Sequence, residues 1–216
     1  MHRLSTWVGA CALTIAASFL WLAVSSPMMG AAEAQSEEVD TSGIVEMVLG
    51  DPNAPVEMIE YASYTCPHCA AFHEGAYKNL KADYIDTGKV KFVYREVYFD
   101  KYGLWASMVA RCAGPDRFFG INDMIYETQR DWTRAGDEAA IAAALRKIGL
   151  LAGVEPDQLD ACMRDGDKAR TLVAWFQENV TEHDITATPS FVINGSKVSN
   201  QSWDDLSALL DAELGS

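Results

Sequence analysis

Two cysteines two residues apart, in the tetrapeptide Cys66-Pro67-His68-Cys69, constrain the fold of this chain more than any other feature. Such a pair either closes a small disulfide ring or holds a metal ion. The apolar segment before the pair, residues 56–61, is typical of a buried strand, and the segment from Pro67 onward is typical of a helix. A cysteine pair at a strand-to-helix junction predicts thiol–disulfide exchange rather than a structural zinc site.

A metal site is the alternative interpretation, because His68 and His73 add two potential ligands to the cysteine pair. Structural zinc sites usually take a second pair of ligands from another segment. Only Cys112 and Cys162 could supply that pair, and they lie far apart within a region that we expect to be helical. The sequence therefore favours redox chemistry, with no metal and no cofactor other than the cysteine pair.

The first 34 residues have the layout of a secretory signal peptide. A short basic start precedes an apolar run that is strongest over residues 7–24, and Ala32-Glu33-Ala34 supplies the small-x-small pattern of a cleavage site. We expect export to the periplasm and cleavage after Ala34. The alternative is an uncleaved membrane anchor, since an apolar run of about 18 residues is at the lower edge of a membrane-spanning length.

Cysteine count and charge narrow the class of protein. Removal of residues 1–34 would remove Cys11, so that an even number of the five cysteines remains, which in an exported chain favours disulfides over free thiols. The formal net charge of −14 argues against binding to nucleic acid or to anionic lipid.

Hydrophobic periodicity divides the rest of the chain into four parts. Residues 35–43 form a flexible acidic lead-in. Residues 44–99 follow the order strand, strand, helix, strand, which suggests a parallel βαβ unit. Residues 100–183 are helical, and residues 184–216 return to strand in a hairpin with an Asn-Gly turn before a last helix. This order predicts an α/β fold interrupted by a helical insertion.

Several local expectations follow from the same patterns. The helix that begins after Cys66 is expected to run to about Asp86. Pro156 is expected in the first turn of a short helix that Gly166 closes. His73, one turn beyond the second cysteine, is expected on the helix surface.

The CPHC motif, Glu60 on the preceding strand and Thr188-Pro189 before a short apolar strand together resemble the DsbA-type periplasmic thiol:disulfide oxidoreductases of the thioredoxin superfamily. The resemblance covers nearly all of residues 44–216. It implies a thioredoxin-like fold, in which a central mixed sheet is flanked by helices, with an inserted helical domain.

The resemblance also implies a role for each residue of the motif. Cys66 at the helix start forms the mixed disulfide with substrate, and Cys69 resolves it. Free backbone N–H groups and the helix dipole would lower the pKa of Cys66 below the ordinary value of about 8.5, and a protonated His68 would add to the effect. A stabilised thiolate makes the disulfide oxidising, as in DsbA at about −120 mV against about −270 mV for thioredoxin, a difference of roughly 7 kcal/mol.

The resemblance assigns Glu60 and Thr188-Pro189 to the same site. Glu60 would be a buried acid beneath the cysteines that relays protons to Cys69, and the alternative is a carboxylate at a solvent-facing strand edge. Pro189 would follow a cis peptide bond and lie against the cysteine pair, leaving the Thr188 backbone free to pair with an extended substrate. The alternative is an ordinary trans-proline at a strand start.

The other two cysteines, Cys112 and Cys162, are expected to form a structural disulfide across the helical domain. The alternative is two separate core cysteines on apolar helical faces. Some relatives carry such a second pair, which is suggested to tune the first.

The resemblance thus implies an exported dithiol oxidase that introduces disulfides into unfolded secreted proteins with free thiols. It also implies a DsbB-type membrane protein as reoxidant. We further expect a monomer, and the acidic charge predicts no nucleic-acid partner. A disulfide isomerase or reductant on the same fold is the nearest alternative, because Thr188 stands where the best-known DsbA pattern has valine. A non-redox periplasmic module that binds metal or peptide is the alternative from a different class.

Overall fold

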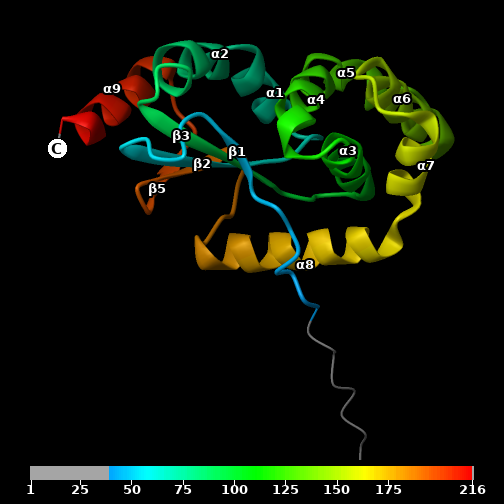
Figure 1. Ribbon diagram of the computed structural model, residues 1–216. Coiled ribbons are helices and arrows are strands. Elements are labelled where there is room, and N and C mark those ends of the chain that lie inside the picture. The colour runs from blue at the N-terminus through cyan, green and yellow to red at the C-terminus, as the bar shows by residue number, and fades with distance from the viewer. Residues whose placement is uncertain (1–38, 216) are drawn as a thin grey trace, which may run out of the picture. The chain divides into compact units, whose positions relative to one another are not determined.

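A five-stranded sheet runs through the computed structural model, which describes residues 39–215 (Figure 1). The strand order is β1-β3-β2-β4-β5, and only β2 and β3 run parallel to each other, so the sheet is mixed. The strands are β1 (Met47–Leu49), β2 (Val56–Ala62), β3 (Val90–Glu96), β4 (Ser190–Ile193) and β5 (Ser196–Ser199). The signal peptide and cleavage site expected over residues 1–34 lie outside the described residues.

The two faces of the central strand β2 are buried in different cores, because successive side chains point to opposite faces of a sheet. Met58 joins the larger core, which extends into the helices that follow β2 and β3. Ile59 and Tyr61 join a smaller core against the long helix α8 (Gly166–Glu182), seen across the lower face of the sheet in Figure 1. Burial on both faces explains why the residues of β2 other than Glu57 and Glu60 are apolar.

The connection from β2 to β3 is not the single helix that the sequence predicted. It is divided into α1 (Pro67–Glu74), α2 (Ala76–Leu80) and a π-helical turn, η1 (Lys81–Ile85). Gly75 lies between the first two with φ −119° and ψ −97°, outside the helical region, and glycine adopts such conformations at little steric cost. The helical pattern of apolar residues therefore continues through the segment although the backbone does not.

The helical insertion lies between β3 and β4 in sequence, and most of it is beside the sheet in Figure 1. Before α8 it comprises α3 (Lys101–Arg111), α4 (Pro115–Glu127), α5 (Gln129–Trp132), α6 (Glu138–Leu151) and α7 (Pro156–Arg164). Pro156 begins α7 as predicted, but Gly166 is the first residue of α8 and does not close α7. Asp165 separates the two helices, because its side chain accepts a hydrogen bond from the backbone N–H of Lys168 and caps the start of α8.

The C-terminal part follows its sequence signals closely. Asn194 and Gly195 both have positive φ, at 45° and 79°, as the tight turn between β4 and β5 requires. The N-cap of the final helix α9 (Trp203–Leu214) is Ser202, whose hydroxyl accepts a hydrogen bond of 3.2 Å from the Asp205 backbone N–H.

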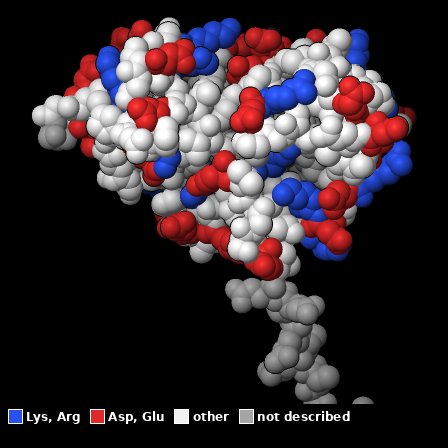
Figure 2. Space-filling model, in the orientation of Figure 1, with Lys and Arg blue, Asp and Glu red and all other residues white. Residues whose placement is uncertain are grey.

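Acidic and basic side chains are interspersed on the face shown in Figure 2, without a broad basic area. Within residues 39–215, no helix is both long enough and apolar enough to cross a membrane.

Candidate active site

The CPHC motif lies at a strand-to-helix junction, as the segments on either side of it predict. Strand β2 ends at Ala62, and Cys66 is the N-cap of α1 with extended backbone dihedral angles of −84° and 119°. Pro67 occupies the first helical turn, where its missing N–H costs no hydrogen bond. Cys66 is 8% exposed and Cys69 is fully buried, while Pro67 and His68 are exposed. The sulfur that substrate could approach is therefore that of Cys66.

Hydrogen bonds at the helix start lower the pKa of the Cys66 thiol to about 5. The largest contribution is the hydrogen bond from the Cys69 side chain, and the backbone N–H groups of Cys69 and His68 add to it, while burial opposes them. These donors stabilise the thiolate relative to the thiol. The contribution of His68 to this shift is through its backbone N–H.

The environment of Cys69 has the opposite effect. Burial raises the pKa of the Cys69 thiol far above its ordinary value, and its hydrogen bond to Cys66 and the negative charge of Glu60 act in the same direction. In the reduced pair, one sulfur is therefore held as a thiolate and the other as a thiol. Both cysteines are free of disulfide bonding in this structure.

Glu60 is completely buried on β2, in the large core and not at a solvent-facing edge. Its oxygens lie 3.0 and 3.2 Å from Nε2 of His73. His73 was expected on the surface, but it is 4% exposed and its ring stacks on Tyr126, with centroids 4.0 Å apart and planes at 11°. The physical reason is that His73 is four residues beyond Cys69, so both side chains lie on the same buried face of α1.

The loop before β4 brings the Thr188-Pro189 pair to the cysteines. The Thr188–Pro189 peptide bond is cis, Pro189 is buried and Thr188 is partly exposed. Sγ of Cys66 lies 3.5 Å from the carbonyl oxygen of Thr188. Antiparallel pairing of β4 with β2, with Ser190 opposite Tyr61, fixes this loop beside the end of β2.

Gln129 is a site residue that the sequence analysis missed. From α5 of the helical insertion, its Nε2 donates hydrogen bonds of 2.8 Å to the carbonyl oxygens of Tyr64 and Cys66. These bonds hold the loop between β2 and α1. The Cys66 carbonyl oxygen also accepts the helical hydrogen bond of 3.2 Å from the Ala70 N–H, so Gln129 adds a second donor there and supplies the Tyr64 carbonyl with its partner. No local sequence signal marks this contact.

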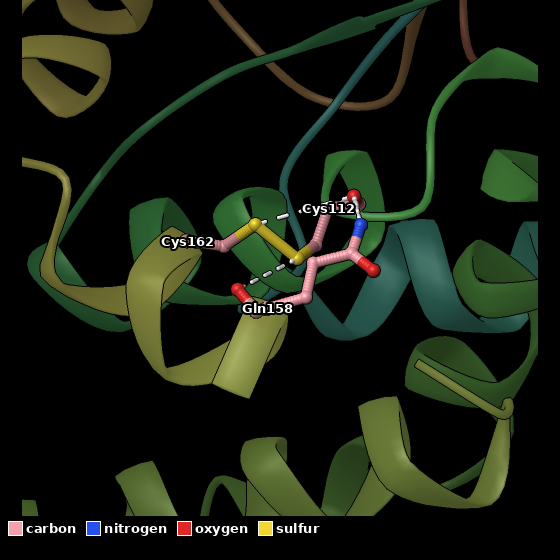
Figure 3. The surroundings of a disulfide bond; sticks show 3 residues. All are labelled: Cys112, Gln158 and Cys162. Atoms are coloured by element: carbon pink, nitrogen blue, oxygen red, sulfur yellow. Dashed lines mark hydrogen bonds between the residues drawn. A yellow bond between two sulfur atoms is a disulfide. The ribbon is translucent and has the colours of Figure 1, made fainter. Parts of the chain in front are cut away.

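The other cysteine pair forms a disulfide, Cys112–Cys162, with Cα atoms 5.8 Å apart. It joins the end of α3 to α7, and Nε2 of Gln158 donates a hydrogen bond of 2.8 Å to the Cys112 carbonyl oxygen (Figure 3). These cysteines are therefore bonded to each other and do not complete a metal site with the CPHC motif. Among the described residues, no group of three or more His, Cys, Asp or Glu side chains is placed to hold a metal ion.

Comparison with known proteins supplies the family. The family model Thioredoxin_4, described as Thioredoxin, matches residues 42–212. The chain belongs to this family. Because the match extends from the lead-in to α9, it includes the helical insertion as well as the sheet.

Relatives of this Thioredoxin_4 chain are named for disulfide chemistry. A Rickettsia bellii relative named as a protein-disulfide oxidoreductase is 34% identical over 199 residues, which cover 89% of this chain and 76% of the relative. Disulfide bond formation protein D of Bacillus subtilis is 27% identical and is matched over 76% of its length by 77% of this chain. The chain spans 60–62% of the length of four further Rickettsia relatives.

Among solved structures, alpha-DsbA1 of Wolbachia pipientis is similar, with a TM-score of 0.71 and 29% identity. The match covers 79% of this chain and 91% of that protein. The chain is thus a protein-disulfide oxidoreductase with a DsbA-like thioredoxin fold and a helical insertion.

Proposed function

We propose that this protein is a dithiol oxidase, which donates the Cys66–Cys69 disulfide to unfolded exported proteins. The observation that carries the proposal is the contrast between the two thiols, with a lowered pKa at Cys66 and a raised pKa at Cys69. A stabilised Cys66 thiolate stabilises the reduced form of the pair. The disulfide then gains free energy when it accepts two electrons, and this favours oxidation of substrate thiols.

The reaction begins when a substrate thiolate attacks Sγ of Cys66 in the disulfide form. A substrate–Cys66 disulfide forms, the Cys66–Cys69 bond breaks, and Cys69 leaves as a thiolate that takes up a proton because it is buried. A second substrate thiolate attacks the substrate sulfur of the mixed disulfide and releases Cys66 as its stabilised thiolate. The substrate gains one disulfide, and the cysteine pair gains two electrons.

The loop that contains the cis-proline positions the substrate. The Thr188 carbonyl lies beside Cys66, and an extended substrate segment that adds to the Thr188 backbone would place its cysteine near Sγ. Backbone pairing of this kind is independent of side-chain sequence. It suits an enzyme that acts on many unfolded chains.

The compartment and partners belong to the same proposal. We infer a periplasmic protein, exported with cleavage after Ala34, or alternatively held in the membrane by an uncleaved N-terminal segment. The Cys112–Cys162 disulfide supports an oxidising compartment. The partners would be unfolded secreted proteins with free thiols and a DsbB-type membrane reoxidant, and the enzyme would act as a monomer without nucleic acid.

Oxidative refolding of a reduced, unfolded protein with native disulfides tests the proposal. The oxidised enzyme should form substrate disulfides in stoichiometric amounts, and Cys66→Ser should abolish the transfer. A matched cysteine control is the Cys112→Ala, Cys162→Ala double variant, which should still transfer its active-site disulfide. Failure to oxidise reduced substrate, with repair of a scrambled one, would support the isomerase alternative, and full activity of Cys66→Ser would support a non-redox binding module.

A further inference from the structure

His73 contacts the buried Glu60 carboxylate and also lines a cavity that is bounded by α1, α2, η1 and α4. Its Nε2 bonds the Glu60 oxygens, while its Nδ1 is buried and has no hydrogen-bond partner among residues 39–215. The same ring lines a cavity of about 170 Å³, together with Tyr77 and Tyr126. This volume holds several water molecules, and a buried polar atom without a partner is a usual place for one.

The chemistry of the cysteine pair needs proton movement at this depth. Cys69 takes up a proton when its disulfide opens and loses that proton when the disulfide forms again, yet its side chain is fully buried. Cys69 and His73 lie one turn apart on the same buried face of α1, and His73 contacts Glu60, so this face of α1 packs over the carboxylate. Glu60 is itself 0% exposed, and the partner that its carboxylate contacts among the described hydrogen bonds is His73.

We propose that His73 is a proton-relay residue, which moves protons between cavity water and Glu60 and acts through Glu60 on Cys69. This inference rests on the proposed redox function. When Cys69 becomes a thiolate, Nε2 of His73 gives its proton to the Glu60 carboxylate, which passes it to Cys69, while Nδ1 takes a proton from cavity water that solvent replaces. When the disulfide forms again, each proton moves back by the same route, so the imidazole regains its starting tautomer and no other reactant is needed.

The surroundings of His73 favour this route over others. Five titratable groups contact the ring or act on it, namely Glu60 on β2, Tyr94 on β3, Tyr77 on α2, and Asp123 and Tyr126 on α4. The charged residues that line the same cavity are Glu74, Lys78, Lys81, Asp86 and Glu127. Burial raises the pKa values of the three tyrosines, which therefore keep their protons near neutral pH. Among the described hydrogen bonds of Glu60, the partner is the imidazole of His73, and each of its two ring nitrogens can carry or accept a proton.

The test measures the step in which Cys69 must lose its proton. Reduced protein is converted with oxidised glutathione to the Cys66–glutathione mixed disulfide, and release of glutathione by Cys69 is followed by stopped flow from pH 5 to pH 8. His73→Gln retains an amide donor toward Glu60 but cannot relay a proton. We expect it to slow release by about 100-fold, the lower end of the range for a positioned acid–base group. Added imidazole should restore the rate of His73→Ala.

A second histidine supplies a matched control. His183 bonds the hydroxyl of Tyr61, which points to the opposite face of β2 from Glu60, so His183→Gln should release glutathione at the wild-type rate. The pKa of Cys66, measured from thiolate absorbance, should be the same in His73→Gln and wild type. This result would separate a relay at Cys69 from a general disturbance of the site.

The outcomes distinguish the relay from the function on which it rests. A wild-type protein that forms no glutathione adduct, or never resolves it, contradicts the proposed redox function. Normal formation and resolution with an unchanged rate in His73→Gln overturns the relay alone.

If His73→Gln does not fold, Ala82→Phe provides the test. Ala82 lines the cavity and is exposed, so a larger side chain there would displace water while leaving the His73–Glu60 pair intact. Slower release in Ala82→Phe supports the relay, and an unchanged rate contradicts it.

Discussion

Removal of the Cys112–Cys162 disulfide tests how the helical insertion is stabilised. The bond joins residues 50 positions apart, and closing a loop of that length in the unfolded chain corresponds to about 4 kcal/mol in the chain-entropy model. Other contacts across the same helices would remain in the double variant Cys112→Ala, Cys162→Ala. One is the hydrogen bond of 2.8 Å from Nε2 of Gln158 on α7 to the backbone carbonyl of residue 112, which does not depend on the cysteine side chain, so the folded state should be retained.

The assay is urea unfolding of two proteins that both carry Cys66→Ser and Cys69→Ser, one with and one without the Cys112–Cys162 disulfide, so that one disulfide alone differs. We expect the free energy of unfolding to fall by about 4 kcal/mol and the denaturant slope to rise, because the unfolded chain becomes less compact. The midpoint of thermal unfolding should fall by roughly 8–16 °C for a domain of this size. A loss below about 1 kcal/mol with an unchanged slope would refute the loop-closure account.

The remaining predictions concern pH and a buried ion pair. Because the folded pKa of Cys66 is about 5, below its ordinary value of about 8.5, its thiolate adds stability that is complete above the ordinary value and lost as pH falls through 5. The free energy of unfolding of the reduced wild-type protein should therefore rise from pH 5 to pH 8.5 relative to that of Cys66→Ser. Parallel pH profiles of wild type and Cys66→Ser would contradict this prediction. Arg111→Ala should cost about 3–5 kcal/mol by urea unfolding, since it leaves the buried Glu96 carboxylate without the guanidinium nitrogens that bond it at 2.6 and 2.7 Å. The exposed control Asp167→Asn should cost less than about 0.5 kcal/mol, and equal losses would mean that burial of the pair is not decisive.

The sequence predicted those parts of the site that depend on local patterns. The strand-to-helix junction placed Cys66 at a helix start, and the resemblance to the DsbA-type proteins implied that the Glu60 carboxylate is buried. His73 carried a usable signal that was overlooked, namely its i+4 spacing from Cys69 combined with a buried carboxylate that needs a partner. Gln129 carried no such sequence signal, because it lies 63 residues from Cys66 along the chain and the packing of the helical insertion brings the two together.

The errors in the fold have similarly physical origins. The apolar residues of the segment 67–85 keep a helical spacing throughout. This spacing predicts neither the backbone break at Gly75 nor the π-helical turn that follows. Gly166 was assigned to a helix end because glycine is common there, but Asp165 already caps the next helix. Patterns of side-chain burial thus predicted which segments pack, while the backbone geometry within them depended on single capping and breaking residues.

The most direct test of the central proposal is the redox potential of the Cys66–Cys69 pair. Equilibration with glutathione, followed by mass analysis of the peptide that contains both cysteines, measures this pair separately from Cys112–Cys162. The account predicts a potential near that of DsbA, about −120 mV, together with a Cys66 thiolate that titrates near pH 5. A potential near that of thioredoxin, about −270 mV, would contradict the assignment as an oxidase.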